Sequence, residues 1–181
     1  MPAPLILLSG PPGAGKSTTA AALARRFSHA LHIPVDDLRT WVVSGIAHPV
    51  PWTDESTRQF RLARTAAGRT ARIYREAGFA VIIDDVLFPT DPRVFFPEEV
   101  EEPVVKVLLL PSLEVALRRN ELRFTKDFDH QVLIETITKI HEAMTAAPYA
   151  DEGWIVLDNS KDEGVEETVD TILRRIELSG N

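Results

Sequence analysis

The sequence predicts an α/β fold in which a five-stranded parallel sheet lies between two layers of helices. Two observations predict this fold class. Five short apolar runs alternate with longer segments that carry the helical spacing of Leu, Ile, Val and Ala. Paired aspartates follow the second and third apolar runs, which is the edge of a parallel sheet where ligands bind.

The apolar runs predict strands at residues 4–8, 30–34, 80–83, 104–110 and 154–157. The helical spacing predicts helices at residues 17–28, 37–44, 56–76, 112–123, 129–147 and 162–178. Prolines indicate that the segments 45–54 and 89–103 are irregular. No linker, repeat or low-complexity tract divides the chain, so we expect residues 1–181 to form one domain.

Composition limits the classes of function. The 181 residues are 44% hydrophobic and 26% charged, which is typical of a soluble globular domain. No apolar stretch approaches the roughly 20 residues of a membrane-spanning helix, so we expect a cytoplasmic protein with no membrane partner. The absence of cysteine excludes disulfides, zinc–thiolate sites and thiol nucleophiles. The net charge of −7 disfavours a nucleic-acid partner.

Residues 10–17, Gly-Pro-Pro-Gly-Ala-Gly-Lys-Ser, match the P-loop pattern G-x-x-x-x-G-K-[ST] between an apolar strand and a helix. Glycines let the backbone curl around a phosphate group at a helix N-terminus, so we expect ATP and Mg²⁺ as cofactors. Lys16 is expected to act on the β- and γ-phosphates and Ser17 to bind the metal. The predicted nucleotide-binding residues here are Gly10, Pro11, Pro12, Gly13, Ala14, Gly15, Lys16, Ser17 and Thr18.

Asp36 and Asp37 follow the second strand, and Arg39 comes shortly after them. A carboxylate at this edge can accept the proton of an attacking hydroxyl group, and an arginine one turn later can hold the acceptor. We therefore predict that one of the two aspartates acts as a catalytic base and that Arg39 binds the acceptor. The alternative is that one of the aspartates only caps the helix.

Asp84 and Asp85 end the third strand, where P-loop proteins hold Mg²⁺. The sequence leaves open which aspartate serves the metal. We assign Ser17 and Asp84 to the metal and Asp85 to the acceptor. The alternative is that the aspartates are solvated loop residues without a role in binding.

A cluster of cations lies on or just beyond the predicted helix after the fourth strand, at Arg118, Arg119, Arg123 and Lys126. Arg119 and Arg123 share one helical face. We predict that both bind the nucleotide and act in catalysis by clamping the transferring phosphoryl group, as part of a lid at about residues 118–130. The alternative is a solvated face paired with Glu114 and Glu121.

The segment at about 45–54 contains Pro49, Pro51 and Trp52, and we predict an acceptor-binding insertion here. Trp52 and the pair Phe95–Phe96 either line an acceptor pocket or anchor loops onto the core. The histidines at 48, 130 and 141 lack the spacing of metal ligands, which indicates surface or packing roles.

The chain resembles small P-loop kinases that include polynucleotide 5′-hydroxyl kinases and chloramphenicol phosphotransferase. Residues 36–39, Asp-Asp-Leu-Arg, match the polynucleotide kinase pattern Asp-Asp-x-Arg, in which the first aspartate is the base and the arginine contacts the acceptor. The resemblance therefore implies that Asp36 is the catalytic base and meets the acceptor together with Arg39. Residues 119–123 match its lid pattern Arg-Asn-x-x-Arg. Val35-Asp36 and the strand end at residues 83–86, Ile-Asp-Asp-Val, are similar to the chloramphenicol enzyme.

This resemblance implies a nucleoside/polynucleotide-kinase-like P-loop NTPase fold. It also implies transfer of the γ-phosphoryl group of ATP to a hydroxyl group. We expect a small-molecule acceptor. One alternative is a polynucleotide 5′-hydroxyl kinase, and another is a nucleotide-dependent switch or NTPase without an acceptor.

Overall fold

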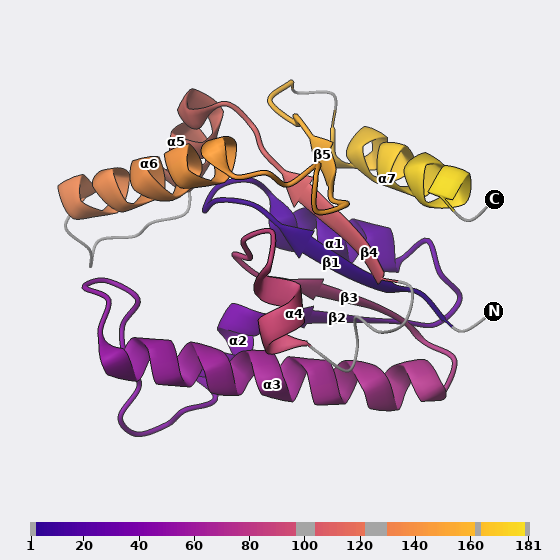
Figure 1. The fold of residues 1–181 in the computed structure, drawn as a ribbon, viewed down its shortest axis with the longest axis horizontal. Helices are drawn as coiled ribbons and strands as arrows, with labels where there is room; N and C mark the ends of the chain where they lie inside the picture. The colour runs from indigo at the N-terminus through magenta and orange to yellow at the C-terminus, as the bar shows by residue number, and fades with distance from the viewer. Residues whose placement is uncertain (1–2, 97–103, 122–129, 162–163, 180–181) are drawn as a thin grey trace.

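The computed structural model describes residues 3–96, 104–121, 130–161 and 164–179. At its centre is a five-stranded sheet with the strand order β2-β3-β1-β4-β5 (Figure 1). The strands are β1 (Leu5–Ser9), β2 (Ala30–Pro34), β3 (Ala80–Asp84), β4 (Val104–Leu109) and β5 (Ile155–Leu157). All neighbouring strands pair in parallel. The predicted five-stranded parallel sheet is therefore confirmed.

Helices connect the strands as the sequence predicts. They are α1 (Lys16–Ala24), α2 (Val35–Thr40), α3 (Asp54–Glu76), α4 (Asp91–Phe95), α5 (Leu113–Glu121), α6 (His130–Ala146) and α7 (Val165–Ser179). The longest, α3, begins at a capping box in which the side chains of Thr53 and Ser56 satisfy each other's backbone N–H groups.

Two predictions about this chain's helices are wrong. The helix predicted at 37–44 ends at Thr40, because the chain then turns so that Arg39 donates a hydrogen bond to the carbonyl of Ala47. The segment predicted as irregular at 89–103 contains α4. Pro92 lies in the first turn of α4, where its missing N–H group costs no helical hydrogen bond.

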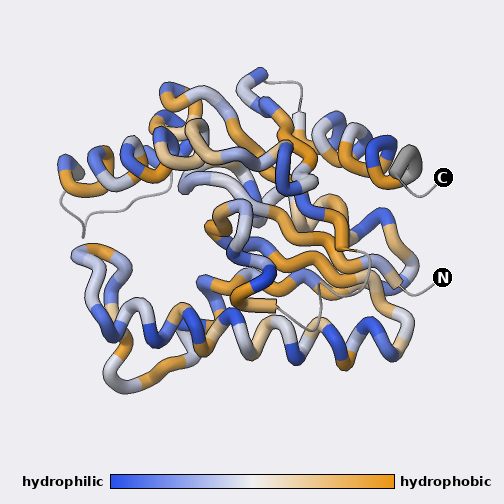
Figure 2. Tube along the Cα trace, viewed as in Figure 1, coloured by the Kyte–Doolittle hydropathy of each residue, from blue (hydrophilic) through white to orange (hydrophobic). Residues whose placement is uncertain are grey.

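The sheet separates two hydrophobic cores because successive strand residues point to opposite faces. Ile6, Leu8 and Ile82 point to the face covered by α1 and α7. Leu7 and Ile83 point to the face covered by α3 and α6. Figure 2 shows the apolar strands between helices whose apolar sides face the sheet. This arrangement confirms the three-layer architecture.

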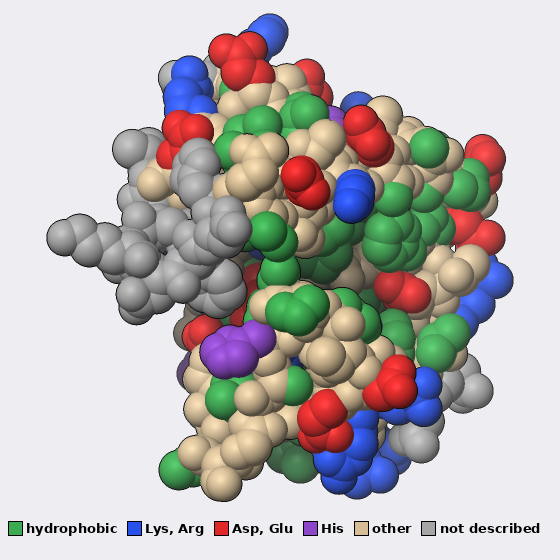
Figure 3. Space-filling model, turned by 90° about the vertical axis from the view of Figure 1, so that its left-hand side faces the viewer, with side chains coloured by type: hydrophobic (Ala, Val, Ile, Leu, Met, Phe, Trp, Pro, Cys, Tyr) green, Lys and Arg blue, Asp and Glu red, His purple; other side chains and the backbone are tan. Residues whose placement is uncertain are grey.

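All strands run in one direction, so their carboxyl ends share one edge of the sheet, on the left in Figure 1. Figure 3 looks directly at this edge and shows acidic, basic and apolar side chains gathered around a hollow. In the described part of the chain, no helix has both the length and the apolar character needed to cross a membrane.

Candidate active site

The P-loop follows β1 and is fixed by close backbone packing. Gly13 has a φ of 83°, and a Cβ atom at this position would lie 2.1 Å from the carbonyl oxygen of Ala116. A Cβ atom at Gly10 would lie 2.4 Å from the carbonyl oxygen of Leu109. Both contacts are with backbone atoms that have no freedom to move away. Glycine is therefore required at both positions by the fold. Phosphate binding by this loop stays a prediction.

Lys16 begins α1 and folds back over the loop. Its ammonium group donates hydrogen bonds of 2.8 Å to the carbonyl of Gly10 and 3.2 Å to that of Pro11. Gly15 is the N-cap residue and makes no side-chain cap bond. The first N–H groups of the helix are therefore free of a side-chain cap at a terminus that favours anions.

Ser17 and Asp84 meet where α1 faces the end of β3. The hydroxyl group of Ser17 donates a hydrogen bond of 3.3 Å to Oδ1 of Asp84. Asp84 is only 5% exposed. A hydroxyl and a carboxylate are oxygen ligands of the kind that Mg²⁺ prefers, so these residues fit a magnesium ion beside the phosphates. The contact supports the assignment of both residues to the metal, which stays a prediction.

The next aspartate contacts the opposite helix layer. Oδ2 of Asp85 accepts a hydrogen bond of 2.5 Å from Nε of Arg64 on α3, and Oδ1 accepts one of 2.7 Å from the backbone N–H of Val86. Burial raises the pKa of Asp85, and both donors oppose this effect. The negative charge of Asp36 raises that pKa further. Contact between Asp85 and an acceptor stays a prediction.

Asp36 and Arg39 lie one helical turn apart on α2 but differ in exposure. The side chain of Asp36 is 76% exposed, whereas that of Arg39 is 7% exposed. Oδ1 of Asp36 lies 3.7 Å from Nη1 of Arg39. The guanidinium of Arg39 also lies 3.9 Å from the ring centre of Phe60. A fixed arginine therefore stands beside a carboxylate that is free to meet a substrate.

The capping alternative for Asp36 and Asp37 is wrong. The N-cap residue of α2 is Pro34, and no side-chain cap bond forms there. Both aspartates lie in the first turn of the helix and both are exposed.

The predicted acceptor-binding insertion is attached to the start of α3. The side-chain amide of Gln59 bonds the carbonyl of Gly45 at 2.8 Å and the N–H of Ala47 at 2.9 Å. Trp52 stacks on Phe60 with 4.9 Å between ring centres and stays 55% exposed. Trp52 therefore anchors the insertion and also exposes apolar surface. Acceptor binding by this segment stays a prediction.

The two phenylalanines of the pair 95–96 have different roles. Phe96 is fully buried in the core on the α3 side of the sheet. The ring centre of Phe95 lies 4.3 Å from the guanidinium of Arg64. Phe96 therefore anchors its segment, whereas Phe95 holds the arginine that pairs with Asp85.

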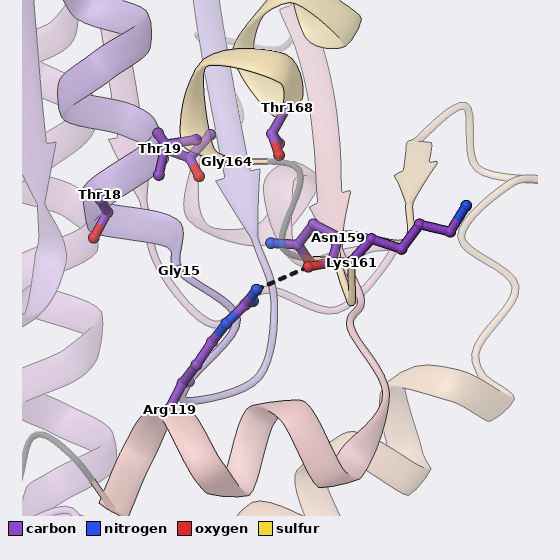
Figure 4. A pocket seen from close by; sticks show the side chains of 10 residues that line it. Gly15, Thr18, Thr19, Arg119, Asn159, Lys161, Gly164 and Thr168 are labelled. Atoms are coloured by element: carbon purple, nitrogen blue, oxygen red, sulfur yellow. Dashed lines mark hydrogen bonds between the residues drawn. The ribbon is translucent and has the colours of Figure 1, made fainter.

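A cavity of about 400 Å³ opens beside the P-loop. It is lined by Gly13, Gly15, Thr18, Thr19, Arg119, Asn159, Lys161, Gly164, Val165 and Thr168. In Figure 4, Arg119 extends from α5 toward Asn159, and its Nη2 donates a hydrogen bond of 3.0 Å to the carbonyl of that residue. The side-chain amide of Asn159 donates one of 2.8 Å to the carbonyl of Ala14. Arg119 thus links the P-loop cavity to the segment after β5.

The solvated-face alternative does not describe Arg119, which is half-buried against this cavity. Its predicted clamp on the transferring phosphoryl group stays a prediction. Arg118, another cation of the predicted lid, is exposed on α5. Arg123 and Lys126 lie outside the described residues.

The glycine-constrained loop, the oxygen pair beside it and the strand order define a P-loop kinase fold. The chain belongs to the AAA domain family, whose model matches residues 5–147. A search of curated proteins gives no match. The resemblance to polynucleotide kinases and chloramphenicol phosphotransferase stays a prediction.

Several solved structures share the fold. A sugar kinase from Janibacter is 21% identical with a TM-score of 0.69, over 97% of this chain and 95% of that one. A gluconokinase from Sinorhizobium meliloti is 19% identical with a TM-score of 0.67, over 98% and 95%. A thymidylate kinase from Candida albicans is 14% identical with a TM-score of 0.71, over 99% and 93%. At these identities the similarity shows the fold.

Sequence reasoning missed three residues that the fold brings to the site, namely His32, Arg64 and Asn159. Nε2 of His32 lies within hydrogen-bonding distance of Oδ2 of Asp84. The sequence does carry a signal for His32. His32 lies two residues before the end of β2, so the two positions point to the same face of the sheet. Arg64 and Asn159 carry no such local signal, since each meets its partner through tertiary packing.

Proposed function

We propose that this protein transfers the γ-phosphoryl group of ATP to a hydroxyl group of a small molecule. One observation carries the proposal. The hydrogen-bonded pair of Ser17 and the buried Asp84 lies at the same edge of the sheet as the exposed carboxylate of Asp36. One side of the site is thus suited to phosphate and metal, and the other presents a base to an acceptor.

The residues of the phosphate side bind and orient the nucleotide. The P-loop N–H groups and Lys16 hold the β- and γ-phosphates, and Lys16 exchanges its bonds to the loop carbonyls for bonds to phosphate oxygens. Ser17 and Asp84 hold Mg²⁺, which when bound offsets the negative charge of the phosphate oxygens. The cavity lined by Arg119 receives the base and ribose.

The residues of the acceptor side prepare the hydroxyl group. Asp36 accepts its proton while the hydroxyl oxygen bonds to the γ-phosphorus, and the bond from that phosphorus to the bridging oxygen breaks to release ADP. Arg39 stands 3.7 Å from the base and fixes its orientation. Arg39 and Asp85 contact polar groups of the acceptor.

Two alternatives have specific support. The Asp-Asp-x-Arg match at residues 36–39 favours a polynucleotide 5′-hydroxyl kinase, whereas the net charge of −7 disfavours it. The P-loop by itself also fits a nucleotide-dependent switch. The structural relatives include a sugar kinase and a gluconokinase, which supports a small hydroxylated acceptor.

The test is a transfer assay with γ-labelled ATP. Sugars, hydroxy acids, nucleosides and a 5′-hydroxyl oligonucleotide are each offered as the acceptor, and free labelled phosphate is measured in parallel. We expect label on a small molecule and its loss in Lys16→Ala. Label on the oligonucleotide alone would establish the polynucleotide alternative, and free phosphate alone would replace the kinase proposal by an NTPase or switch.

A further inference from the structure

We propose that His32 is a positioning residue that orients the metal-binding carboxylate of Asp84. The inference rests on the proposed function for the role of Asp84, and it adds a residue that no P-loop pattern contains. His32 lies on the edge strand β2, outside the P-loop and outside the two aspartate pairs.

The register of the sheet brings the two side chains together. His32 pairs with Ile82, and Pro34 pairs with Asp84. His32 is therefore the diagonal neighbour of Asp84 on one face of the sheet, a distance that an aromatic ring spans. Ile82 shares this face and packs in the α1 core, so both side chains lie on the side where Ser17 stands in the first turn of α1.

The two carboxylate oxygens of Asp84 have different hydrogen-bond partners. Oδ2 of Asp84 is hydrogen-bonded to Nε2 of His32. Oδ1 accepts a hydrogen bond of 3.3 Å from the hydroxyl group of Ser17. The side chains of His32 and Asp84 are 18% and 7% exposed, so water reaches this pair poorly. A buried carboxylate oxygen without a partner is costly. His32 therefore satisfies Oδ2 and leaves Oδ1 directed at the position of the metal.

Without this contact the carboxylate loses its fixed orientation. The terminal torsion of an aspartate is broad, so packing and hydrogen bonds decide where its oxygens point. Partners that orient a metal-binding carboxylate typically change metal affinity by about 10- to 100-fold. We expect an effect of this size on the affinity for the metal and little effect on metal-free nucleotide binding.

Three variants of the full chain test the inference. His32→Leu removes the donor, whereas His32→Gln offers an amide nitrogen at about the same reach. His29→Gln is the matched control, because His29 is an exposed histidine three residues earlier whose ring packs on Phe79. If His32→Leu does not fold, as seen in its circular dichroism, His32→Asn replaces it, since its amide is one methylene shorter.

The primary measurement is Mn²⁺ binding, followed by electron paramagnetic resonance with a non-hydrolysable ATP analogue. We expect the Mn²⁺ dissociation constant to rise about 10- to 100-fold in His32→Leu or His32→Asn. His32→Gln should recover most of the affinity, and His29→Gln should match wild type. Unchanged affinity without the donor, or a His32→Gln variant as weak as His32→Leu, would overturn the inference.

This readout separates the inference from the proposed function. Mn²⁺ binding needs no acceptor and no phosphoryl transfer, so a failed transfer assay leaves the comparison of variants intact. Conversely, normal transfer with an unchanged metal affinity in His32→Leu would reject His32 and retain the kinase.

Discussion

Around Gly13 the chain is fixed by its own backbone, whereas around Arg39 it is held by long side chains. On the phosphate side, the carbonyl oxygen of Ala116 lies 2.1 Å from the position that a Cβ atom at Gly13 would take. On the acceptor side, Arg39 and Arg64 lie over the ring of Phe60, and each binds a carbonyl of a neighbouring segment. Under the proposed function, the difference means that the phosphate side is fixed by the fold, while the acceptor side is set by replaceable side chains.

Replacing the base gives the largest effect expected on the acceptor side. Asp36→Asn removes the proton acceptor and keeps the shape, so we expect kcat to fall by about 10²- to 10⁴-fold with ATP affinity little changed. Asp37→Asn is the matched control on the same exposed turn and should lower kcat much less. Steady-state kinetics on both variants make the measurement. A larger fall in kcat for Asp37→Asn than for Asp36→Asn would show that the base is Asp37.

The rigidity of the phosphate side is tested by two glycines with nearly equal backbone angles. Gly13 and Gly78 have φ values of 83° and 86°, but a Cβ atom at Gly78 would meet nothing within 4 Å. Gly78→Ala should cost about 1–2 kcal/mol of unfolding free energy, for the left-handed backbone alone. Gly13→Ala adds a backbone collision, and we expect about 2–5 kcal/mol in total. Urea unfolding measures the loss of unfolding free energy in both variants. Equal losses would show that the P-loop backbone moves to accommodate the added Cβ atom.

The same division explains what could be predicted from the sequence. The strands and the P-loop follow from local patterns, because apolar runs and glycine spacing are local properties. The pleat also separates Asp84 from Asp85, since neighbouring strand residues face opposite layers. The partner of Asp85 could not be predicted, because Arg64 lies 21 residues away along the chain. Likewise, Arg119 meets a carbonyl 40 residues away.

Arg119 is a long side chain that lies beside the backbone-fixed P-loop. We expect its replacement to have a smaller effect on the kinetics than replacement of Asp36. Its guanidinium bonds Asn159 beside the P-loop cavity, where a nucleotide base can lie against its plane. Such a contact is worth about 0.5–2 kcal/mol, so Arg119→Ala should raise the KM for ATP by about 2- to 30-fold. Arg119→Lys should recover little, since it lacks the planar group. A fall in kcat with unchanged KM would instead establish the clamp on the transferring phosphoryl group.

The smallest effect concerns the buried carboxylate of the acceptor side. Burial raises the pKa of Asp85 in the folded protein above its ordinary value of 3.8, although Arg64 opposes this. The folded state therefore holds the proton at a higher pH than the unfolded chain does. Stability from this group is fully present below the ordinary pKa and is lost as the pH rises through the raised pKa. An asparagine does not titrate, so the stability of Asp85→Asn lacks this contribution to the pH dependence.

We therefore expect the unfolding free energy of wild type minus that of Asp85→Asn to fall as the pH rises and then to level off. Urea unfolding at a series of pH values from acid to neutral measures this difference, in which the titration of the other groups largely cancels. Arg64→Leu sharpens the result, because removing the opposing charge should extend the loss to higher pH. A difference that rises with pH would show that the Arg64 ion pair outweighs burial. The acceptor side would then be held by charge pairing, in contrast to the backbone packing of the P-loop.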